Sequence, residues 1–493
     1  MKARASTLSP EDRTVQSGLS EQELKQFERI FYARSIAVVG ASTDQRKMGF
    51  QWVAGLLSAG YKGAVYPVNL GGGEIMNLKI HPRLTDIPGP VDLVICCIPR
   101  LRVLDLLNDC AAKQIGGISF FTAGFRETGE PEWIRVEEEM ARRARAGGFR
   151  IIGPNCMGIS CPEQGIPFGP SPITNKVGSA AFISQSGGHA GKLGTISLTR
   201  LIGLSKLASI GNCCDLGSAD YLAYLAWDRK TEVVGMYLEG PRDSARLLKV
   251  MGEATRRKPV FVWKGGRTAA GARAATSHTG ALAASASVWS GALRQAGAVE
   301  INGLDEMADT LLLFQSVGRL ERANLGIICG LTDGGGGEAV LSADACAAQG
   351  IDVIPFTDKT RRELLSVLGQ VGSVLVNPVD VSQRTGNLQA FEKTIELVAA
   401  EPDVDLIAVY ENMDILLGFI GRPITDLMNE VVAKARQKYG KPVIVVSPPG
   451  ALEKDRVDVE SRLSEAGVPV FPSMERAAKA IANVRQHCRL HPG

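Results

Sequence analysis

The sequence predicts an α/β protein built from three consecutive doubly wound domains. Short runs rich in Val, Ile and Ala alternate with amphipathic helical stretches along nearly the whole chain. Continuous apolar strands separated by helices are typical of parallel sheets that helices cover on both faces. The length of 493 residues exceeds one ordinary domain and fits three. The strand-like runs are residues 35–40, 92–98, 150–153, 180–184, 233–239, 260–266, 325–330, 406–410 and 442–446.

Composition shifts along the chain indicate where these domains begin and end. The first 27 residues are polar and lead into a predicted helix near 20–31. A Pro- and Gly-rich stretch at 161–179 has no periodicity and is interpreted as a linker or long loop. A second break falls at 317–324, before a new strand. The predicted division is an N-terminal extension, 1–27, followed by domains at 28–165, 166–320 and 321–493.

The overall composition excludes several classes of protein. Apolar residues make up 45% of the chain and charged residues 22%, and the net charge is only +3. A nearly balanced charge argues against binding to nucleic acid or an anionic membrane. No apolar run is long enough for a membrane span or a secretory signal. The ten cysteines show no Cys-x-x-Cys spacing, so we expect no metal site, free thiols and a cytoplasmic location.

The first domain opens with a strand, residues 35–40, that runs directly into a polar turn and a helix. A glycine at the strand's end, Gly40, followed by a helix N-terminus is a phosphate-binding arrangement. Ser42 replaces the second glycine of the dinucleotide pattern, and Asn69 stands where NAD enzymes carry Asp or Glu. These departures disfavour NAD. They favour a nucleotide-like ligand held by amides, hydroxyls, Arg46 and Lys47; the alternative is a sheet with no ligand.

The second domain opens with the stretch FISQSGGHAG, residues 182–191. A strand followed by Ser-Gln-Ser-Gly-Gly and a helix presents hydroxyls and N–H groups at the positive end of that helix. The pattern predicts a second anion site. Because Ser-Gly turns commonly cap helices for structural reasons, this pattern alone is a weak indication.

His278 lies in a run of small residues after the strand at 260–266. Lys264, Arg267 and Arg273 precede it, and Ser, Thr, Gly and Ala surround it. Such neighbours are too small to bury an imidazole in a core, although a core histidine stays an alternative. A metal site is disfavoured because no second ligand lies at ligand spacing. A phosphate-accepting imidazole beside a helix N-terminus is physically reasonable, since the amide dipoles stabilise added negative charge.

Together these stretches resemble the NDP-forming acyl-CoA synthetases, of the ADP-forming acetate–CoA ligase type, which are relatives of the succinyl-CoA synthetase α subunit. The similarity extends from about residue 25 to the end, in the order of the family. The stretches that carry it are VVGAS (38–42), YPVN (66–69), TAGF (122–125), IGPNCMG (152–158), ISQSGG (183–188), SIGN (209–212), YLEG (237–240), KGGRTAAGARAATSHTGALA (264–283) and VNPVD (376–380).

The resemblance implies a Rossmann-like CoA-binding domain followed by two flavodoxin-like ligase domains. It also implies that His278 is transiently phosphorylated and that the Glu239 carboxylate orients its imidazole. The phosphate would be received by Ser184, Ser186, Gly187 and Gly188. The positions that match CoA-binding residues of the family are Gly40, Ala41, Ser42, Lys47, Tyr66, Pro67, Asn69, Ala123, Gly124 and Asn155.

The implied activity interconverts acyl-CoA, ADP and phosphate with a carboxylic acid, CoA and ATP. In this family the nucleotide site belongs to an ATP-grasp domain, and nothing after residue 321 resembles one. The third domain instead carries LTDGGGGEAV (331–340), with Gly336 where relatives have proline. The resemblance therefore implies a separate ATP-grasp β subunit, which would bind ADP or ATP with Mg²⁺, in a heterotetramer of two α and two β subunits.

The sequence departs from the family near the expected acyl pocket. Gly188 and His189 replace a usual Ala-Leu pair, and Cys213 and Cys214 stand where polar residues are common. The acid therefore need not be acetate, and His189 either binds a second carboxylate of the substrate or packs against the sheet.

Three other functions compete with the ligase. A non-catalytic CoA-binding or sensing protein is disfavoured by the intact His278 and Glu239. A dehydrogenase is disfavoured by Asn69, and a succinyl-CoA synthetase proper by the third domain.

Overall fold

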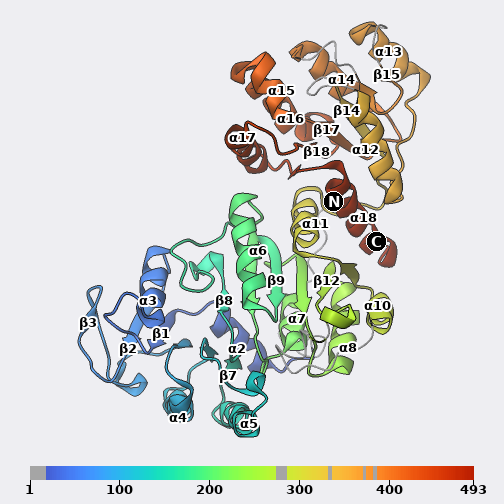
Figure 1. Ribbon diagram of the computed structural model, residues 1–493. Coiled ribbons are helices and arrows are strands. Elements are labelled where there is room, and N and C mark those ends of the chain that lie inside the picture. Colours follow the sequence, from blue (N-terminus) through green and yellow to red (C-terminus); the bar gives the residue numbers. More distant parts are fainter. Residues whose placement is uncertain are drawn as a thin grey trace. The chain divides into compact units, whose positions relative to one another are not determined.

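The computed structural model describes residues 18–271, 273, 286–330, 336–369, 374–380 and 386–492 (Figure 1). The described chain divides into two compact units. One comprises the residues up to Leu198 together with Ile202–Leu304, and the other comprises Thr199–Leu201 and the residues from Asp305 onward. The first unit contains two sheets of more than two strands, and the second unit contains one.

The first sheet is entirely parallel, with the strand order β2-β1-β5-β6-β7. Its order reverses between β1 and β5, so a crevice opens there at the carboxyl ends of the strands. The strands are β1 (Ser35–Val39), β2 (Ala64–Val68), β5 (Leu93–Cys96), β6 (Gly117–Phe120) and β7 (Arg150–Ile152). The helices are α2 (Glu21–Phe31), α3 (Met48–Ser58), α4 (Val103–Lys113) and α5 (Pro131–Ala146), and a small hairpin joins β3 (Glu74–Ile75) and β4 (Leu78–Lys79).

The second sheet has the order β13-β12-β11-β9-β10-β8, and only its edge strand β8 is antiparallel among the described strands. The reversal falls between β9 and β11. The strands are β8 (Gly158–Ser160), β9 (Val177–Ser184), β10 (Leu204–Ser209), β11 (Val233–Leu238), β12 (Val260–Lys264) and β13 (Val299–Ile301). The helices are α6 (Gly187–Thr199), α7 (Ser218–Trp227), α8 (Ser244–Thr255) and α10 (Ala286–Gln295).

The third sheet, in the second unit, has the order β15-β16-β14-β17-β18-β19 and reverses between β14 and β17. Its edge strand β15 is antiparallel to β16. The strands are β14 (Leu325–Cys329), β15 (Val374–Leu375), β16 (Val379–Asp380), β17 (Leu406–Tyr410), β18 (Val443–Val446) and β19 (Val470–Phe471). The helices are α11 (Leu304–Val317), α12 (Gly336–Ala348), α13 (Asp358–Leu368), α14 (Leu388–Ala400), α15 (Met413–Ile415), α16 (Arg422–Tyr439), α17 (Glu453–Glu465) and α18 (Met474–Leu490).

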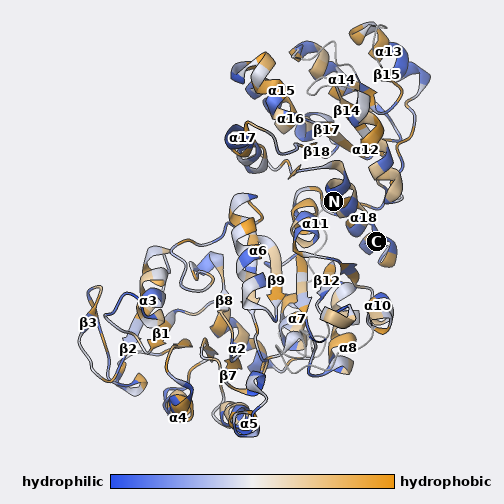
Figure 2. Cartoon of the chain, in the orientation of Figure 1, coloured by the Kyte–Doolittle hydropathy of each residue, from blue (hydrophilic) through white to orange (hydrophobic). Residues whose placement is uncertain are grey.

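The predicted fold class, α/β with three doubly wound parallel sheets, is confirmed. The strands form the buried centre of each domain; for example, all residues of β1, β11 and β17 are buried. In Figure 2 the strand β9 is mainly hydrophobic, whereas the helix α5 also carries hydrophilic stretches. This distribution follows the pattern of continuous apolar strands from which the fold class was predicted.

Helix α2 contacts both larger sheet domains of the first unit. Ser20 and Glu23 form a capping box at its start, which fixes where the helix begins. Arg29 pairs with Asp92, the residue before β5, at 2.9 Å. On the other side, the ring of Phe27 stacks on Tyr224 of α7 with the ring centroids 4.8 Å apart. The helix thus contacts the first sheet and a helix of the second.

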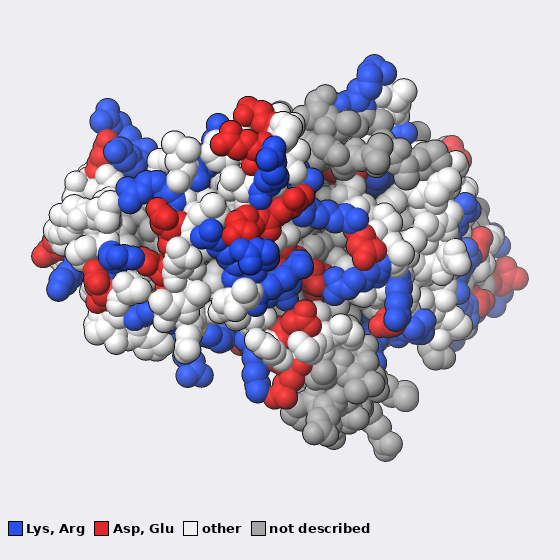
Figure 3. Space-filling view, turned by 90° about the horizontal axis from the view of Figure 1, so that it is seen from below, with Lys and Arg blue, Asp and Glu red and all other residues white. Residues whose placement is uncertain are grey.

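The described surface carries charges of both signs. On the face shown in Figure 3, basic and acidic residues are interspersed. Among the residues that the structure describes, no helix is long and apolar enough to cross a membrane. The described residues also hold no group of three or more His, Cys, Asp or Glu side chains that could bind a metal ion.

Candidate functional site

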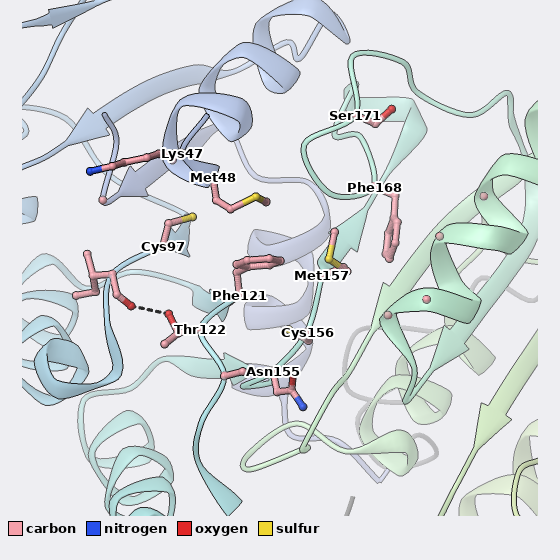
Figure 4. A pocket seen from close by; sticks show the side chains of 18 of the residues that line it. Lys47, Met48, Cys97, Phe121, Thr122, Asn155, Cys156, Met157, Phe168 and Ser171 are labelled. Atoms are coloured by element: carbon pink, nitrogen blue, oxygen red, sulfur yellow. Dashed lines mark hydrogen bonds between the residues drawn. The ribbon is translucent and has the colours of Figure 1, made fainter. Parts of the chain in front are cut away.

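A cavity of about 1100 Å³ lies in the first unit, between the carboxyl edge of the first sheet and helix α6 (Figure 4). Loops that follow β1, β5 and β6 form one side of it, and α6 forms the other. The cavity therefore occupies the crevice that the reversal between β1 and β5 opens. Among the described residues predicted as site residues, those that line it are Gly40, Lys47, Ala123, Asn155, Gly187 and Gly188.

Two glycines bring the loop after β1 and helix α3 into close contact. Gly40 has a φ of +95°, and a Cβ there would lie 2.9 Å from the carbonyl carbon and oxygen of Cys97. A Cβ on Gly49 would lie 2.0 Å from the Gly40 carbonyl oxygen. Only glycine at both positions lets α3 begin directly against this loop. The N-terminus of α3, which the side chain of its N-cap residue Lys47 does not cap, therefore faces the crevice.

Other residues predicted to bind CoA hold this loop instead of lining the cavity. The Asn69 side-chain amide donates a hydrogen bond to the carbonyl of Ala41. The Ser42 hydroxyl accepts from the amide of Asp44 at 3.1 Å. Pro67 is buried in β2, and the ring of the half-buried Tyr66 lies edge-on to His81, with centroids 6.0 Å apart.

The turn after β6 is fixed by hydrogen bonds on both of its sides. Gly124 has a φ of +99°, its amide donates to the Glu127 carboxylate at 2.6 Å, and its carbonyl accepts from Arg100 at 2.6 Å. Asn212, from the second sheet's side of the unit, donates to Glu127 at 2.5 Å. The Asn155 amide donates to Asn212 at 3.4 Å. These bonds connect the cavity-lining turns of the first sheet to the second sheet.

The first turn of α6 forms the opposite end of the site. Ser186 precedes the helix, and its hydroxyl accepts from the His189 amide at 3.3 Å, as an N-cap residue does. The buried Ser184 hydroxyl donates to the Ser186 carbonyl at 2.7 Å and accepts from the Ser186 amide at 3.1 Å. Gly187 and Gly188 follow without side chains, so the positive end of the helix is open toward the cavity.

Glu239 lies beside this helix terminus, at the reversal of the second sheet. It directly follows β11, whose Tyr237 is paired in register with Ser184 of β9. Glu239 is 7% exposed, and its carboxylate accepts from the Tyr237 hydroxyl at 3.2 Å. The Gln185 side chain accepts from the Glu239 amide at 2.6 Å, and Lys264 donates to the Glu239 carbonyl at 2.7 Å. The carboxylate is thus held at the crevice between β9 and β11.

His278, the predicted phosphate acceptor, lies outside the described residues, and its role stays a prediction. The first half of the glycine-rich stretch at 331–340 lies outside them too, since the description resumes at Gly336, the first residue of α12.

The structure places the His189 ring in an aromatic cluster. Its centroid lies 4.5 Å from that of Tyr237 and 4.6 Å from that of Trp263. Burial lowers the pKa of His189 below its ordinary value, while the nearby Glu239 acts in the opposite direction. Of the two interpretations left open by the sequence, this position favours packing against the sheet.

Cys213 and Cys214 are both buried thiols. Burial raises the pKa of Cys213 to about 12 and that of Cys214 well above its usual range. Both thiols are therefore protonated near neutral pH, and neither lines the cavity.

Sequence reasoning missed much of the cavity wall. Phe168, Ser171 and Ile173 come from the stretch interpreted as a linker. Phe121 directly precedes the motif TAGF, and Met157 lies within IGPNCMG but was not among the predicted site residues. The available signal was the presence of Ile and Phe within a Pro- and Gly-rich loop. Large apolar residues in a loop indicate that the loop packs against the rest of the protein, whereas a fully solvated linker would be polar.

Two family models match the chain. The CoA binding domain matches residues 34–162, and the succinyl-CoA ligase like flavodoxin domain matches residues 177–314. These ranges contain the first and second sheets, respectively, apart from the edge strand β8.

The similar proteins include several that are named as acid–CoA ligases. The α subunit of the ADP-forming acetate–CoA ligase II of Pyrococcus furiosus is 34% identical over 92% of this chain and 97% of its own length. The 4-hydroxybutyrate–CoA ligase of Nitrosopumilus maritimus is 30% identical over 92% of this chain and 63% of its own length. Among solved structures, the Korarchaeum cryptofilum acetyl-coenzyme A synthetase 1, in complex with phosphate and ADP, has a TM-score of 0.83 at 31% identity and covers 94% of this chain and 97% of its own.

These matches extend over nearly the whole chain and agree with the family resemblance that the sequence motifs indicated. The predicted enzyme class, ADP-forming acid–thiol ligase, is confirmed. The chain belongs to the family of the α subunits of ADP-forming acetate–CoA ligases.

Proposed function

We propose that this chain interconverts acyl-CoA, phosphate and ADP with a carboxylic acid, CoA and ATP through an acyl phosphate and a phosphohistidine at His278. The observation that carries this proposal is the shared cavity: the loops that match CoA-binding positions and the open N-terminus of α6 line the same space. A thioester and a phosphate could meet there.

CoA would lie along the loops of the first sheet. The N-terminus of α3 and the side chain of Lys47 suit a phosphate of the nucleotide. Three cavity-lining residues would contact CoA or let it approach closely: Gly40, Ala123 and Asn155. The remaining predicted positions would set the conformation of the loops that carry these three: Ala41, Ser42, Tyr66, Pro67, Asn69 and Gly124.

Phosphate would bind at the first turn of α6, through the amides of Gly187 and Gly188 and the hydroxyls of Ser184 and Ser186. An oxygen of hydrogen phosphate attacks the thioester carbonyl, and the C–S bond breaks. CoA takes up the proton that the phosphate loses and leaves as the free thiol. The His278 imidazole then attacks the phosphorus of the acyl phosphate, and the P–O bond to the carboxylate breaks. The helix dipole offsets the charge on the transferred phosphoryl group.

Phosphohistidine finally passes its phosphoryl group to ADP. We propose that a β subunit with an ATP-grasp fold supplies ADP with Mg²⁺, in a heterotetramer of two α and two β chains. Two comparisons support a separate partner: the Pyrococcus furiosus relatives are named α subunits, and this chain spans 64% of the Archaeoglobus fulgidus relative. Nine of the ten cysteines are buried, and the described structure places none of the ten in a disulfide. This favours a reducing compartment, and we propose the cytoplasm.

The test is transfer of the γ-phosphoryl group of radioactive ATP to the chain, in a complex with a family β subunit and Mg²⁺. We expect acid-labile, base-stable label that is discharged by CoA plus acid. His278→Ala should abolish it, whereas His491→Ala, a matched control in the second unit, should keep it. An absence of label with an active β subunit would favour the alternative, a CoA-binding or sensing protein.

A further inference from the structure

Three aromatic side chains pack against one another beside the first turn of α6. Tyr237 of β11 and Trp263 of β12 are paired in register, and their ring centroids lie 4.5 Å apart. The His189 ring, from α6, lies edge-on to the Tyr237 ring, with the centroids 4.5 Å apart. Edge-to-face contacts of this kind favour one orientation of a ring over others. The Tyr237 ring is therefore held from two elements, one of which is the helix at which phosphate would bind.

The hydroxyl at the end of the Tyr237 ring is directed at a carboxylate. It donates to Oε1 of Glu239 at 3.2 Å, and both residues are 7% exposed. Burial and the neighbouring carboxylate raise the pKa of Tyr237 above its ordinary value, so the hydroxyl keeps its proton. Against a carboxylate it acts as a donor, and a hydrogen bond to an ionised acceptor is a strong one. This bond restricts the orientations that the Glu239 carboxylate can adopt.

The hydroxyl fits at this place because residue 265 has no side chain. A Cβ on Gly265 would lie 2.5 Å from the Tyr237 hydroxyl oxygen and 3.0 Å from the ring carbon that carries it. Gly265 directly follows β12 and is the second residue of KGGRTAAG, the stretch that leads toward His278. The Tyr237 hydroxyl thus contacts the Glu239 carboxylate and lies against the start of the segment that carries the predicted phosphate acceptor.

Other hydrogen bonds hold the main chain of Glu239. The Gln185 side chain accepts from the amides of Glu239 and Gly240 at 2.6 and 3.0 Å. Lys264 donates to the Glu239 carbonyl at 2.7 Å. These bonds fix the backbone, whereas the bond from Tyr237 acts on the carboxylate itself. Loss of the tyrosine hydroxyl should therefore release the side chain of Glu239 while its backbone stays in place.

We propose that Tyr237 is a positioning residue for phosphoryl transfer, whose hydroxyl fixes the Glu239 carboxylate in the orientation that would receive an N–H of His278. The inference rests on the proposed function, because Glu239 and His278 are the partners through which Tyr237 acts. A carboxylate accepts several hydrogen bonds, so the bond from the tyrosine leaves room for the imidazole. An imidazole held by one nitrogen presents the other to the phosphorus atom. Tyr237 itself touches neither the phosphoryl group nor the imidazole in this mechanism, and it transfers no proton.

The experiment measures the single-turnover rate constant for labelling of the chain by γ-labelled ATP and Mg²⁺, in complex with an active family β subunit. Tyr237→Phe keeps the ring and removes the hydroxyl, so we expect the rate constant to fall about tenfold. CoA affinity, measured by calorimetry, should stay unchanged. Tyr224→Phe is the matched control: Tyr224 is a buried tyrosine of α7 whose hydroxyl donates to the Glu28 carboxylate at 3.1 Å. It should lower the thermal midpoint similarly and leave the labelling rate constant unchanged.

A double-mutant cycle shows whether Tyr237 acts through Glu239. In the Glu239→Gln background, Tyr237→Phe should change the rate constant by about twofold or less, because no carboxylate is left to orient. A purely structural role would give the same fall in both backgrounds.

Gly265→Ala approaches the same contact from the other side. Its Cβ would displace the Tyr237 hydroxyl, so the labelling rate constant should fall in this variant too. Gly291→Ala on α10, where a Cβ meets nothing within 4 Å, is its control and should label at the wild-type rate.

Three results would each overturn the positioning role. They are a Tyr237→Phe rate constant within about twofold of wild type, equal falls in Tyr237→Phe and Tyr224→Phe, and effects of Tyr237→Phe and Glu239→Gln that multiply in the cycle. A Gly265→Ala variant that labels at the wild-type rate would also contradict it. The wild-type complex separates this inference from the proposed function: absent label overturns the ligase mechanism, whereas label with no loss in Tyr237→Phe overturns only the role of the tyrosine.

Discussion

The second and third sheets place a glutamate at the same topological position and surround it differently. Glu239 follows β11 and Glu411 follows β17, and each of these strands borders the reversal of its sheet. Glu239 is 7% exposed and accepts a hydrogen bond from Tyr237. Glu411 is fully buried, neither carboxyl oxygen has a hydrogen-bond partner in the described structure, and burial raises its pKa to about 8.

The two glutamates show that sheet topology sets the position of a side chain, whereas the residues around it set its chemical surroundings. A doubly wound sheet brings the residue after its third parallel strand, here β11 or β17, to the crevice whatever that residue is. Whether a carboxyl there has hydrogen-bond partners depends on its neighbours, such as the Tyr237 hydroxyl beside Glu239. Topology therefore predicts the place of a functional group, and the local sequence predicts its chemical state.

The largest expected effect is on catalysis, from Glu239→Gln. An amide keeps the shape but loses the charge that would orient the His278 imidazole, so we expect kcat to fall about 10²- to 10³-fold. Affinity for CoA, measured by titration calorimetry, should stay unchanged. The control is Glu232→Gln, an exposed residue just before the same strand. A kcat within a factor of three of wild type would remove Glu239 from the mechanism.

The second prediction concerns the stability of the second unit. The folded state holds the Glu411 proton up to a pKa of about 8, whereas the unfolded state releases it near 4.5. The contribution of Glu411 to the free energy of unfolding is therefore fully present below the lower pKa. It falls as pH rises between the two pKa values, by about 1.4 kcal/mol per pH unit at most. We expect Glu411→Gln to remove most of the fall in the denaturant midpoint between pH 6 and pH 8.

Glu401 provides the opposite case in the same unit. Its carboxylate accepts from the Thr357 hydroxyl at 2.6 Å, and hydrogen bonds lower its pKa against the effect of burial. Glu401→Gln should destabilise the unit near neutral pH, and this difference from wild type should shrink as pH falls. Equal pH profiles for the two variants would contradict the proposed difference in surroundings.

The fourth prediction extends the comparison to the first sheet, where Gly40 and Gly49 are in close contact at the wall of the crevice. Gly49→Ala places a Cβ 2.0 Å from the Gly40 carbonyl oxygen, so α3 must move away from the loop. Overpacking of this kind costs about 1–3 kcal/mol, and CoA affinity should fall about 5- to 150-fold. Calorimetry measures the affinity. Gly71→Ala, where a Cβ meets nothing within 4 Å, is the control, and an equal loss in both variants would refute the role of this contact.

The smallest expected effect comes from the hydroxyl at the start of α6. Ser186→Ala removes an N-cap, which costs about 1 kcal/mol, and we expect a rise of about fivefold in KM for phosphate. Ser473 caps α18 by the same kind of bond, to the Arg476 amide at 3.4 Å. Ser473→Ala should therefore lower stability similarly without changing KM for phosphate. If both variants shift KM equally, Ser186 acts only through stability.

Local sequence patterns were sufficient for most of the sheet framework. The runs at 35–40 and 406–410 became β1 and β17 because continuous apolar residues are required where both faces are covered. Strand β10 was not among the runs singled out. It contains Lys206, which is buried because its ammonium pairs with Asp228 at 2.6 Å and donates to the Tyr32 hydroxyl at 3.0 Å. Partners that distant in the chain leave no local pattern.

Residues of the candidate site were predictable from the sequence only where they lie in a recognisable motif. Gly40 and the Ser-Gln-Ser-Gly-Gly turn were found from strand-to-helix patterns, and the structure places both at crevices. Phe168 and Ile173 were not, since a loop without periodicity gives no indication of the surface that it covers. The geometry around His278 lies outside the described residues, so its predicted contact with Glu239 stays a prediction.

Helix α2 has a practical consequence for how this chain can be divided. Its rings of Phe27 and Phe31 stack against Tyr224 of α7, while Arg29 holds Asp92 beside β5. A cut between the CoA-binding and ligase domains would leave matching aromatic surfaces exposed on both fragments. Neither fragment would be expected to stay monodisperse alone, and the two should unfold as a single cooperative transition when left joined.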